Sequence, residues 1–211
     1  MSVLLRVDSS CRVLGSHSRL LGDHAESRWL ESNPDGRVIR RDLADGKIDI
    51  LSGQTVAAFR VPPDDLSAEQ SATLQVSEAL IAELKSADAL LLTAPMYNFS
   101  VSSALKAWID HVSRNGHTFR FENGAYKGLL KAARAIVVCS YGTAEFQSGR
   151  QFASNDYLQP YLRFLLNSLG IPSVAFVAAH GTTTDPETLA GIYAGVRGDL
   201  DRLLAEPVER P

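Results

Sequence analysis

The feature that most constrains the fold is a short apolar run that ends near a proline and is followed at once by a helix signal. Residues 89–92 read Ala-Leu-Leu-Leu without a charge, as in a central strand of a parallel sheet covered on both faces. Pro95 disfavours helix at the residue before it, so the strand leaves into a loop before Ser100 or Ser102 can cap the next helix. Four apolar residues then recur at helical spacing: Leu105, Trp108, Ile109 and Val112. The run therefore predicts a strand, a loop over 96–99 and a helix.

The loop over 96–99, Met-Tyr-Asn-Phe, has the composition of a ligand-binding segment. In open α/β sheets, ligands bind at the carboxyl ends of the strands. Asn98 offers a planar amide, and Tyr97 and Phe99 offer flat apolar walls, which together suit a flat heteroaromatic ring with polar edges. A capped turn without a ligand is the alternative, although exposed aromatics beside an amide are unusual in a plain connection.

A second candidate binding loop follows the first predicted strand, residues 3–7. Four serines crowd the segment 8–18, and a helix is predicted from about residue 18 to a turn at 33–36. Hydroxyl groups ahead of a helix N-terminus, with free N–H groups and the positive end of the helix dipole, suit a phosphate. The serines concerned are Ser10, Ser16 and Ser18. Their alternative role is that of caps and turn formers.

Other features limit what this serine loop binds. The chain has no Walker lysine and no G-x-G-x-x-G motif here, so neither a nucleoside triphosphate nor a Rossmann-bound dinucleotide is indicated. Arg19 is a further candidate for the phosphate, although an arginine in a first helical turn is more often solvated.

The strands and helices alternate along the whole chain. Five apolar segments are predicted as strands, at residues 3–7, 37–43, 89–92, 135–139 and 174–177. Alternation with helices predicts an α/β fold with a doubly wound, five-stranded parallel sheet and helices on both faces. The flavodoxin-like order 2-1-3-4-5 fits best, with the charged second strand near an edge. This order brings the serine loop and the loop 96–99 together, and a phosphate at one with an aromatic ring at the other describes FMN.

Three connections carry further expectations. A projecting hairpin is expected over 116–129, where Phe119 and Phe121 alternate beside an Asn-Gly turn. The strand 135–139 is expected to leave into a turn at 140–143, whose glycine permits close backbone approach, followed by a polar, mobile segment to Asp156. The connection 44–66 is longer than compact domains usually leave unstructured, which marks a lid or an interface.

Composition and charge exclude several classes of function. A net charge of −3 with scattered basic residues argues against nucleic acid or an anionic membrane as a partner. The apolar run before Arg6 is too short for a signal-peptide core and no later run could span a bilayer, so a single domain over 1–211 in the cytoplasm is expected. Two cysteines cannot make a disulfide framework and lack metal-ligand spacing, so no metal is expected. Cys139 is expected to be a small core residue, and Cys11 a buried thiol or, alternatively, a reactive one.

The residues Pro95-Met96-Tyr97-Asn98-Phe99, then Leu105-Lys106 and Thr118-Phe119-Arg120, form a specific pattern. Over nearly its whole length the chain resembles the FMN-dependent NADH azoreductases, also described as NADH:quinone oxidoreductases. Ser-Ser followed by Ser-x-Ser near the start supports the resemblance. It implies an FMN-dependent enzyme that takes electrons from NADH or NADPH and reduces quinones or azo compounds, as a homodimer with two FMN sites at the subunit interface.

The resemblance also implies roles for individual residues. The phosphate and ribityl end of FMN would be held by Ser10, Ser16, His17 and Ser18. The isoalloxazine would contact Met96, Tyr97, Asn98 and Phe99, with Ser140, Tyr141, Gly142 and Thr143 along its other edge. An acceptor pocket would be shaped by Phe119, Phe121 and Phe164, with ordinary packing as their alternative role.

The chain departs from the family pattern in three places. Ser140-Tyr141-Gly142-Thr143 replaces the commoner Ser-Arg-Gly-Gly, and Ala144-Glu145-Phe146 stands where relatives can place a histidine. Phe121 stands where a tyrosine is common. Substrate range is therefore the property that the resemblance transfers least.

The expected mechanism is a ping-pong, two-electron hydride relay in which the flavin carries the chemistry, so that no catalytic side chain is assigned. His117 and His180 are candidate proton donors, and water is the alternative. Competing functions are an FMN reductase or another quinone reductase of this fold, and a non-enzymatic flavodoxin-like electron carrier. A serine hydrolase is disfavoured because no Gly-x-Ser-x-Gly elbow occurs.

Overall fold

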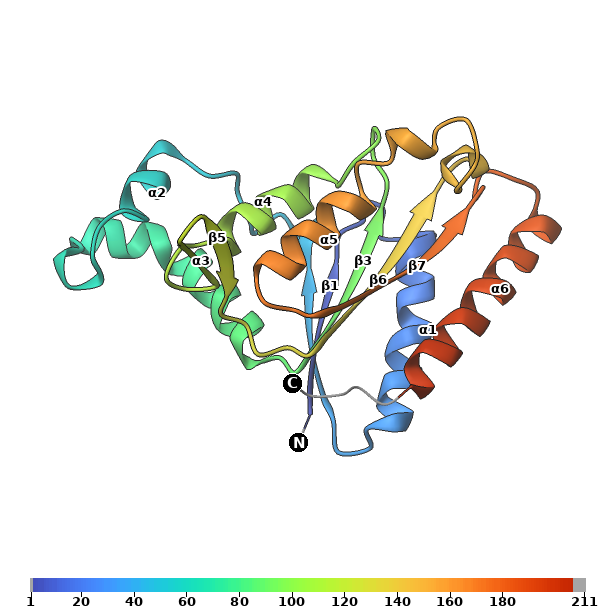
Figure 1. Ribbon diagram of the computed structural model, residues 1–211, viewed down its shortest axis with the longest axis horizontal. Coiled ribbons are helices and arrows are strands. Elements are labelled where there is room, and N and C mark those ends of the chain that lie inside the picture. The colour runs from blue at the N-terminus through green and yellow to red at the C-terminus, as the bar shows by residue number, and fades with distance from the viewer. Residues whose placement is uncertain (1, 207–211) are drawn as a thin grey trace.

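The protein is built as a parallel sheet between two layers of helices, shown in Figure 1 as a computed structural model that describes residues 2–206. Residue 1 and residues 207–211, which the expected single domain includes, lie outside the described residues. The sheet has five strands in the order β2-β1-β3-β6-β7, and every neighbouring pair is parallel. Its strands are β1 (Val3–Asp8), β2 (Arg37–Asp42), β3 (Ala89–Pro95), β6 (Arg134–Tyr141) and β7 (Ser173–His180).

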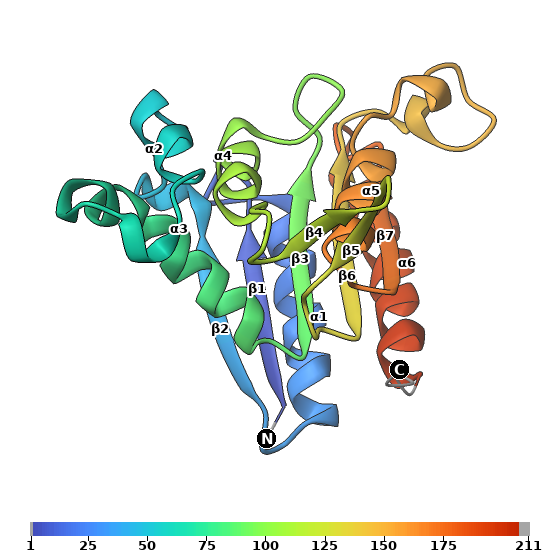
Figure 2. The ribbon, with the colours of Figure 1, turned by 60° about the vertical axis from the view of Figure 1, so that its left-hand side comes forward.

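Helices cover both faces of this sheet, as the alternation of strands and helices predicts (Figures 1 and 2). One face carries α1 (His17–Ser32) and α6 (Pro186–Ala205). The other carries α3 (Ala68–Ser86), α4 (Ser103–Val112) and α5 (Gln159–Ser168). Alternate residues of β3 serve the two faces, because Leu90 and Leu92 pack toward α3–α5 and Leu91 packs toward α1 and α6.

The parallel sheet is confirmed, and its topology is compatible with the expected order 2-1-3-4-5. A two-stranded antiparallel hairpin, β4 (Phe119–Glu122) and β5 (Ala125–Gly128), lies between the third and fourth strands of the sheet in the chain and shifts the numbering. β2 lies at the edge of the sheet, where its charged residues are half-buried or exposed. The hairpin returns against the end of α5, where a Cβ on Gly128 would come within 2.0 Å of the Gly170 nitrogen.

Serine side chains cap α3 and α4. Ser102 caps α4 by accepting from the N–H of Leu105 at 3.1 Å. Ser67 and Gln70 form the reciprocal capping box of α3. All four residues of the predicted apolar face of α4 are buried: Leu105, Trp108, Ile109 and Val112.

The connection between β2 and α3 is not the unstructured segment that its length suggested. It contains the short helices η1 (Leu43–Asp45), α2 (Gly53–Ala58) and η2 (Pro63–Asp65). Ser52 caps α2, and the guanidinium of Arg114 lies 4.7 Å from the centre of the Phe59 ring, which ties this segment to the end of α4.

The two cysteines differ from each other. Cys139 is fully buried in β6, as expected, and burial raises the pKa of its thiol. Cys11 is exposed, so the expectation of a buried thiol there is wrong. The reason is that the loop after β1 turns outward from residue 11 to residue 15 before α1 begins. Among the helices of residues 2–206, none is both long and apolar enough to cross a membrane.

Candidate functional site

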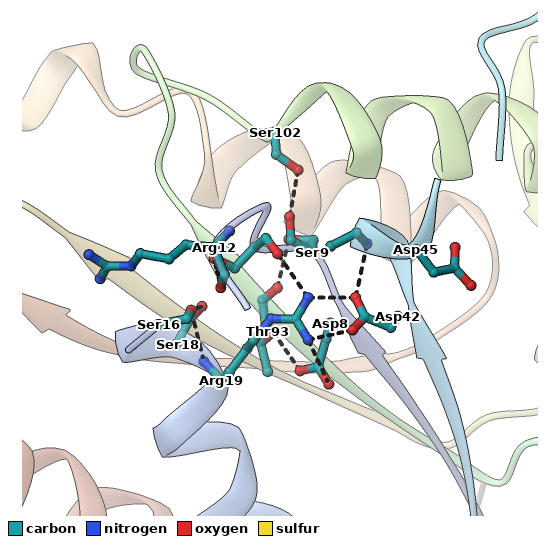
Figure 3. A network of polar contacts seen from close by, with 12 residues as sticks. Asp8, Ser9, Arg12, Ser16, Ser18, Arg19, Asp42, Asp45, Thr93 and Ser102 are labelled. Atoms are coloured by element: carbon teal, nitrogen blue, oxygen red, sulfur yellow. Dashed lines mark hydrogen bonds and ion pairs between the residues drawn. The ribbon is translucent and has the colours of Figure 1, made fainter. Parts of the chain in front are cut away.

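The candidate site lies at the carboxyl edge of the sheet, where the loops after β1 and β3 meet. β1 and β3 are neighbours, and the hydroxyl oxygens of Ser10 and Tyr97 lie 3.5 Å apart across the two loops. Ser9 secures the same junction, because its N–H and its hydroxyl both donate to the carbonyl of Thr93, at 3.1 and 2.7 Å. Ser102 adds a bond of 2.9 Å from its hydroxyl to the carbonyl of Ser9 (Figure 3). The structure thus brings together the two loops that the strand order required.

The start of α1 offers neutral donors and carries no acid. Ser16 is the cap, and its hydroxyl oxygen lies 3.5 Å from the backbone nitrogen of Arg19 and 3.4 Å from the hydroxyl oxygen of Ser18 (Figure 3). The N–H groups of His17 and Ser18 lie in the first turn, where a helix provides no internal acceptor. The first turn of α1 contains no acidic residue. This helix end therefore suits a phosphate.

The charges beneath the serine loop are paired with one another. Arg19 donates to both oxygens of Asp42, at 2.8 and 2.5 Å (Figure 3). It also donates to the carbonyl of Ser10 at 2.8 Å. Hydrogen bonding to Arg19 lowers the pKa of Asp42. Asp8 accepts from the hydroxyl of Thr93 at 2.9 Å and from Arg6 at 3.1 Å. Arg19 is therefore neither solvated nor free for a phosphate, because Asp42 on the neighbouring strand holds it.

His17 is held as a neutral imidazole. Its Nδ1 lies 2.5 Å from the hydroxyl of Tyr193 on α6. Burial, and then the nearby charge of Arg12, lowers the pKa of His17, so that its charged form is disfavoured at neutral pH. One ring nitrogen is thus engaged by α6, and only Nε2 remains for a ligand.

The turn after β3 is strained. Asn98 and Phe99 have φ angles of 47° and 75°, and the N–H groups of Tyr97 and Ser100 each donate to the other's carbonyl, at 3.0 and 3.1 Å. This is the pattern of a type I′ turn, which asparagine tolerates and phenylalanine rarely adopts. The rings of Tyr97 and Phe99 are 37% and 50% exposed. Backbone outliers with exposed rings gather at functional sites, where surrounding contacts hold the strain.

Three of the predicted ring contacts lie inside or against strands rather than in turns. Met96 continues the sheet, since its N–H donates to the carbonyl of Ser140 at 2.9 Å. Ser140 and Tyr141 are the last two residues of β6 and are buried, so the expected turn starts at Gly142. Pairing of Ser140 with Ala179 and of Tyr141 with His180 on β7 extends the strand beyond the length that the sequence predicted.

Tyr141, at the end of β6, contacts both β7 and the segment that leads into α5. Its hydroxyl donates to Asp156 at 2.8 Å and accepts from the Gln159 amide at 2.9 Å, and its ring stacks on His180 at 4.4 Å between centres. Burial raises the pKa of Tyr141 and lowers that of His180. Next to His180 lies an open cleft of about 750 Å³ whose lining contains no acidic, lysine or arginine side chain: Gly142, Thr143, Ala144, His180, Gly181, Thr183, Thr184, Thr188 and Ile192.

The three phenylalanines assigned to an acceptor pocket meet at a residue that sequence reasoning missed. The ring of Tyr126 lies 5.5 Å from Phe119, 5.1 Å from Phe121 and 5.9 Å from Phe164, between ring centres. Tyr126 faces Phe121 across the hairpin register, which the Asn-Gly turn at 123–124 could have indicated. Within residues 2–206 no ring contact joins this aromatic group to Tyr97 or Phe99.

The two candidate proton donors are both disfavoured as cations. Burial and the neighbouring Arg114 lower the pKa of His117, whose Nε2 lies 3.2 Å from the Arg114 guanidinium. Burial lowers the pKa of His180, and its Nδ1 has no hydrogen-bond partner among the described residues. In both histidines, burial thus works against the charged form of the ring.

The fold and the paired loops define a flavodoxin-like protein, and the chain belongs to the family with the flavodoxin-like fold, whose model matches residues 2–203. More particularly, it is 43% identical to the FMN-dependent NADH:quinone oxidoreductase of Xanthobacter autotrophicus over 174 residues, which are 82% of this chain and 84% of that protein. It is 40% identical to FMN-dependent NADH:quinone oxidoreductase 3 of Pseudomonas aeruginosa over 187 residues, 89% of this chain and 85% of that protein. The resemblance stated from the sequence is thereby confirmed.

Solved structures agree on the fold. An FMN-dependent NADH-azoreductase from Bacillus anthracis, solved in complex with FMN, matches with a TM-score of 0.83 over 97% of this chain and 100% of that one, at 24% identity. A second azoreductase structure from Bacillus anthracis gives a TM-score of 0.85 at 17% identity, over 97% of this chain and 99% of that one. At these identities the likeness shows the shared fold.

Proposed function

We propose that the chain is a single-domain, FMN-dependent oxidoreductase that takes electrons from NADH or NADPH and passes them to quinones and azo compounds. The observation that carries the proposal is the junction of the two loops at Ser10 and Tyr97, which sets an acid-free helix end beside a strained aromatic turn. One loop suits a phosphate and the other suits a flat ring, and FMN carries both groups. The names of the most similar relatives support the same cofactor and donor.

The residues present fit FMN along its length. Ser10, Ser16, His17 and Ser18 would hold the phosphate and ribityl end, with the first-turn N–H groups of α1 as additional donors. Met96, Tyr97, Asn98 and Phe99 would contact the isoalloxazine, and Gly142 and Thr143 would line its other edge, with the buried Ser140 and Tyr141 behind them. When bound, FMN supplies the hydride chemistry.

The protein's own part is to bind, orient and stabilise. Backbone N–H groups near Asn98 and Gly142 are candidates to donate where negative charge develops on the ring. Because Ser140 and Tyr141 are buried in β6, they act as support for the backbone at Gly142 rather than as exposed ligands. Burial lowers the pKa of His117 and of His180, which favours water as the source of the proton.

The proposal includes a homodimer with an acceptor pocket shaped by the aromatic group Phe119, Phe121 and Phe164. Phe121 and Phe164 are 56% and 62% exposed on this chain, as expected of rings that meet a partner or a substrate. A cytoplasmic location is also proposed, because a reducing compartment keeps the exposed Cys11 as a thiol.

Steady-state kinetics test the function. We expect NADH oxidation with 1,4-benzoquinone and with an azo dye, and parallel double-reciprocal plots because the donor leaves before the acceptor binds. Intersecting plots, or no NADH oxidation by protein that carries FMN, would contradict the ping-pong scheme. An electron carrier would exchange single electrons without turning over NADH, and an FMN reductase would release the reduced cofactor.

A further inference from the structure

The segment between β6 and α5 contacts the strained turn after β3. The inference drawn from these contacts rests on the proposed function and deepens it. We propose that this crossover, residues 142–158, is a clamp that holds the turn Tyr97–Ser100 in its left-handed conformation, and that Phe146 is the positioning residue that sets FMN affinity through Phe99.

The turn needs such a clamp because its own bonds do not remove the strain. Its two internal hydrogen bonds close the turn, but Phe99 still has a φ of 75°, in a region that a bulky side chain rarely adopts. Strain of this kind persists only where neighbouring structure over-determines the conformation. The neighbours of Phe99 therefore identify the clamp.

The crossover supplies contacts to both the backbone and the ring of Phe99. The N–H of Tyr157 donates to the carbonyl of Phe99 at 3.0 Å. The hydroxyl of Ser100 donates to the carbonyl of Tyr157 at 3.4 Å, so the two segments exchange bonds. The Phe146 ring lies 5.9 Å from the Phe99 ring at 68°, an edge-to-face contact.

The clamp is fixed to the sheet at its other end. The Phe146 ring lies 5.7 Å from Tyr141, the last residue of β6, and 5.8 Å from Phe152. Asp156 accepts from the hydroxyl of Tyr141 at 2.8 Å and, through its other oxygen, from the N–H of Leu158 at 2.8 Å. A continuous set of contacts thus runs from the end of β6 through Phe146 to the turn, and it sets where Asn98 and its N–H lie.

Phe146 and Phe152 offer a matched pair for the test. Both are half-buried phenylalanines in the same crossover, but only Phe146 contacts Phe99. We expect Phe146→Ala to weaken FMN binding about tenfold, because the turn relaxes toward unstrained conformations that do not fit the ring. Phe152→Ala is expected to change the Kd by about twofold or less, and Phe146→Tyr, which keeps the ring, is expected to restore nearly wild-type binding.

The measurement is the Kd of FMN from quenching of flavin fluorescence, with the melting temperature recorded for each variant. Phe146→Leu keeps the crossover packed if the alanine variant fails to fold, and it is expected to lose about threefold in affinity. A double-mutant cycle adds the test of mechanism: in a Phe99→Gly background, where positive φ costs nothing, Phe146→Ala should lose most of its effect.

Two outcomes would overturn the inference while leaving the function intact. One is a Phe146→Ala variant whose FMN affinity matches that of Phe152→Ala. The other is an unchanged effect of Phe146→Ala in the Phe99→Gly background. Failure of the wild-type protein to bind FMN would instead overturn the proposed function, so the two failures are distinguishable.

Discussion

The helices α1 and α6 lie side by side, and both begin at the carboxyl edge of the sheet (Figure 1). Their N-termini have different caps. α1 begins at the neutral cap Ser16, with no acid in its first turn. α6 begins at Asp185, whose carboxylate accepts from the N–H groups of Glu187 and Thr188 at 3.0 and 2.9 Å. One positive helix end is already satisfied by an anion of the chain, and the other is left for an anion from outside.

This difference supports the proposed placement of the cofactor phosphate at the start of α1. Hydrogen bonds from the backbone and hydroxyl of Thr188 lower the pKa of Asp185 to about 2, so the α6 terminus carries a carboxylate throughout the physiological range. The hydroxyls at the start of α1 donate without adding negative charge. Variants at the two helix ends and at the ring end test this difference. Riboflavin serves in the binding experiments as the ligand that lacks the phosphate.

Giving α1 the cap that α6 has should produce the largest effect. Ser16→Asp keeps a good helix cap but sets a carboxylate against the phosphate, so FMN binding should weaken by at least about 100-fold. The melting temperature should stay the same or rise, and riboflavin affinity should change far less. Equal losses for FMN and riboflavin in fluorescence titrations would mean that the phosphate lies elsewhere.

Changing the ring end should weaken both ligands. Asn98→Ala removes a planar amide and a residue that tolerates the left-handed conformation, and it should cost about 2 kcal/mol in FMN affinity. Because the isoalloxazine is common to both, riboflavin should lose as much. Isothermal titration of the two ligands checks this, and an unchanged FMN affinity would disprove the placement of the flavin ring.

Removing one hydroxyl at the phosphate end should have a smaller and more selective effect. Ser18→Ala takes away a buried donor that does not cap the helix, and should cost about 1.5 kcal/mol for FMN and little for riboflavin. The same titrations measure it. A loss shared by riboflavin would instead indicate a change in packing of α1.

The smallest effect concerns acid stability at α6. The pKa of Asp185 in the folded protein, about 2, lies below the ordinary value of about 3.9, so its charge stabilises the fold above pH 4 and that stabilisation is lost as the pH falls toward 2. Asp185→Ser keeps a cap that does not titrate. Melting temperatures between pH 5 and 2.5 should fall more steeply for the wild type, and parallel curves would contradict this linkage.

Local sequence signals were sufficient for several elements of the fold. The apolar run 89–92 predicted the central strand, and the Asn-Gly turn at 123–124 predicted the hairpin. The serines at 100 and 102 predicted a cap for the helix that follows the central strand, which Ser102 supplies for α4. These features are decided by residues close in sequence, which is why they could be predicted without the structure.

Features that depend on distant partners could not be predicted in this way. Arg19 is engaged by Asp42 on another strand, and Tyr126 meets Phe164 only because the hairpin folds onto α5. The segment from the turn 140–143 to Asp156 is expected to be polar and mobile, yet it contains Phe146, whose ring packs against Phe99, Tyr141 and Phe152. These aromatic residues were a signal that the segment packs against its neighbours. The identity of the FMN contacts remains a prediction from the resemblance, supported by how the two loops meet.

The most direct test of the account is an anaerobic titration of the purified protein with FMN, followed by NADH and then by 1,4-benzoquinone, with the visible spectrum recorded at each step. The account predicts stoichiometric FMN binding, full bleaching by one equivalent of NADH and full recovery of the oxidised spectrum with one equivalent of the quinone. A protein that leaves FMN free in solution, or whose bound FMN is not reduced by NADH, would contradict it.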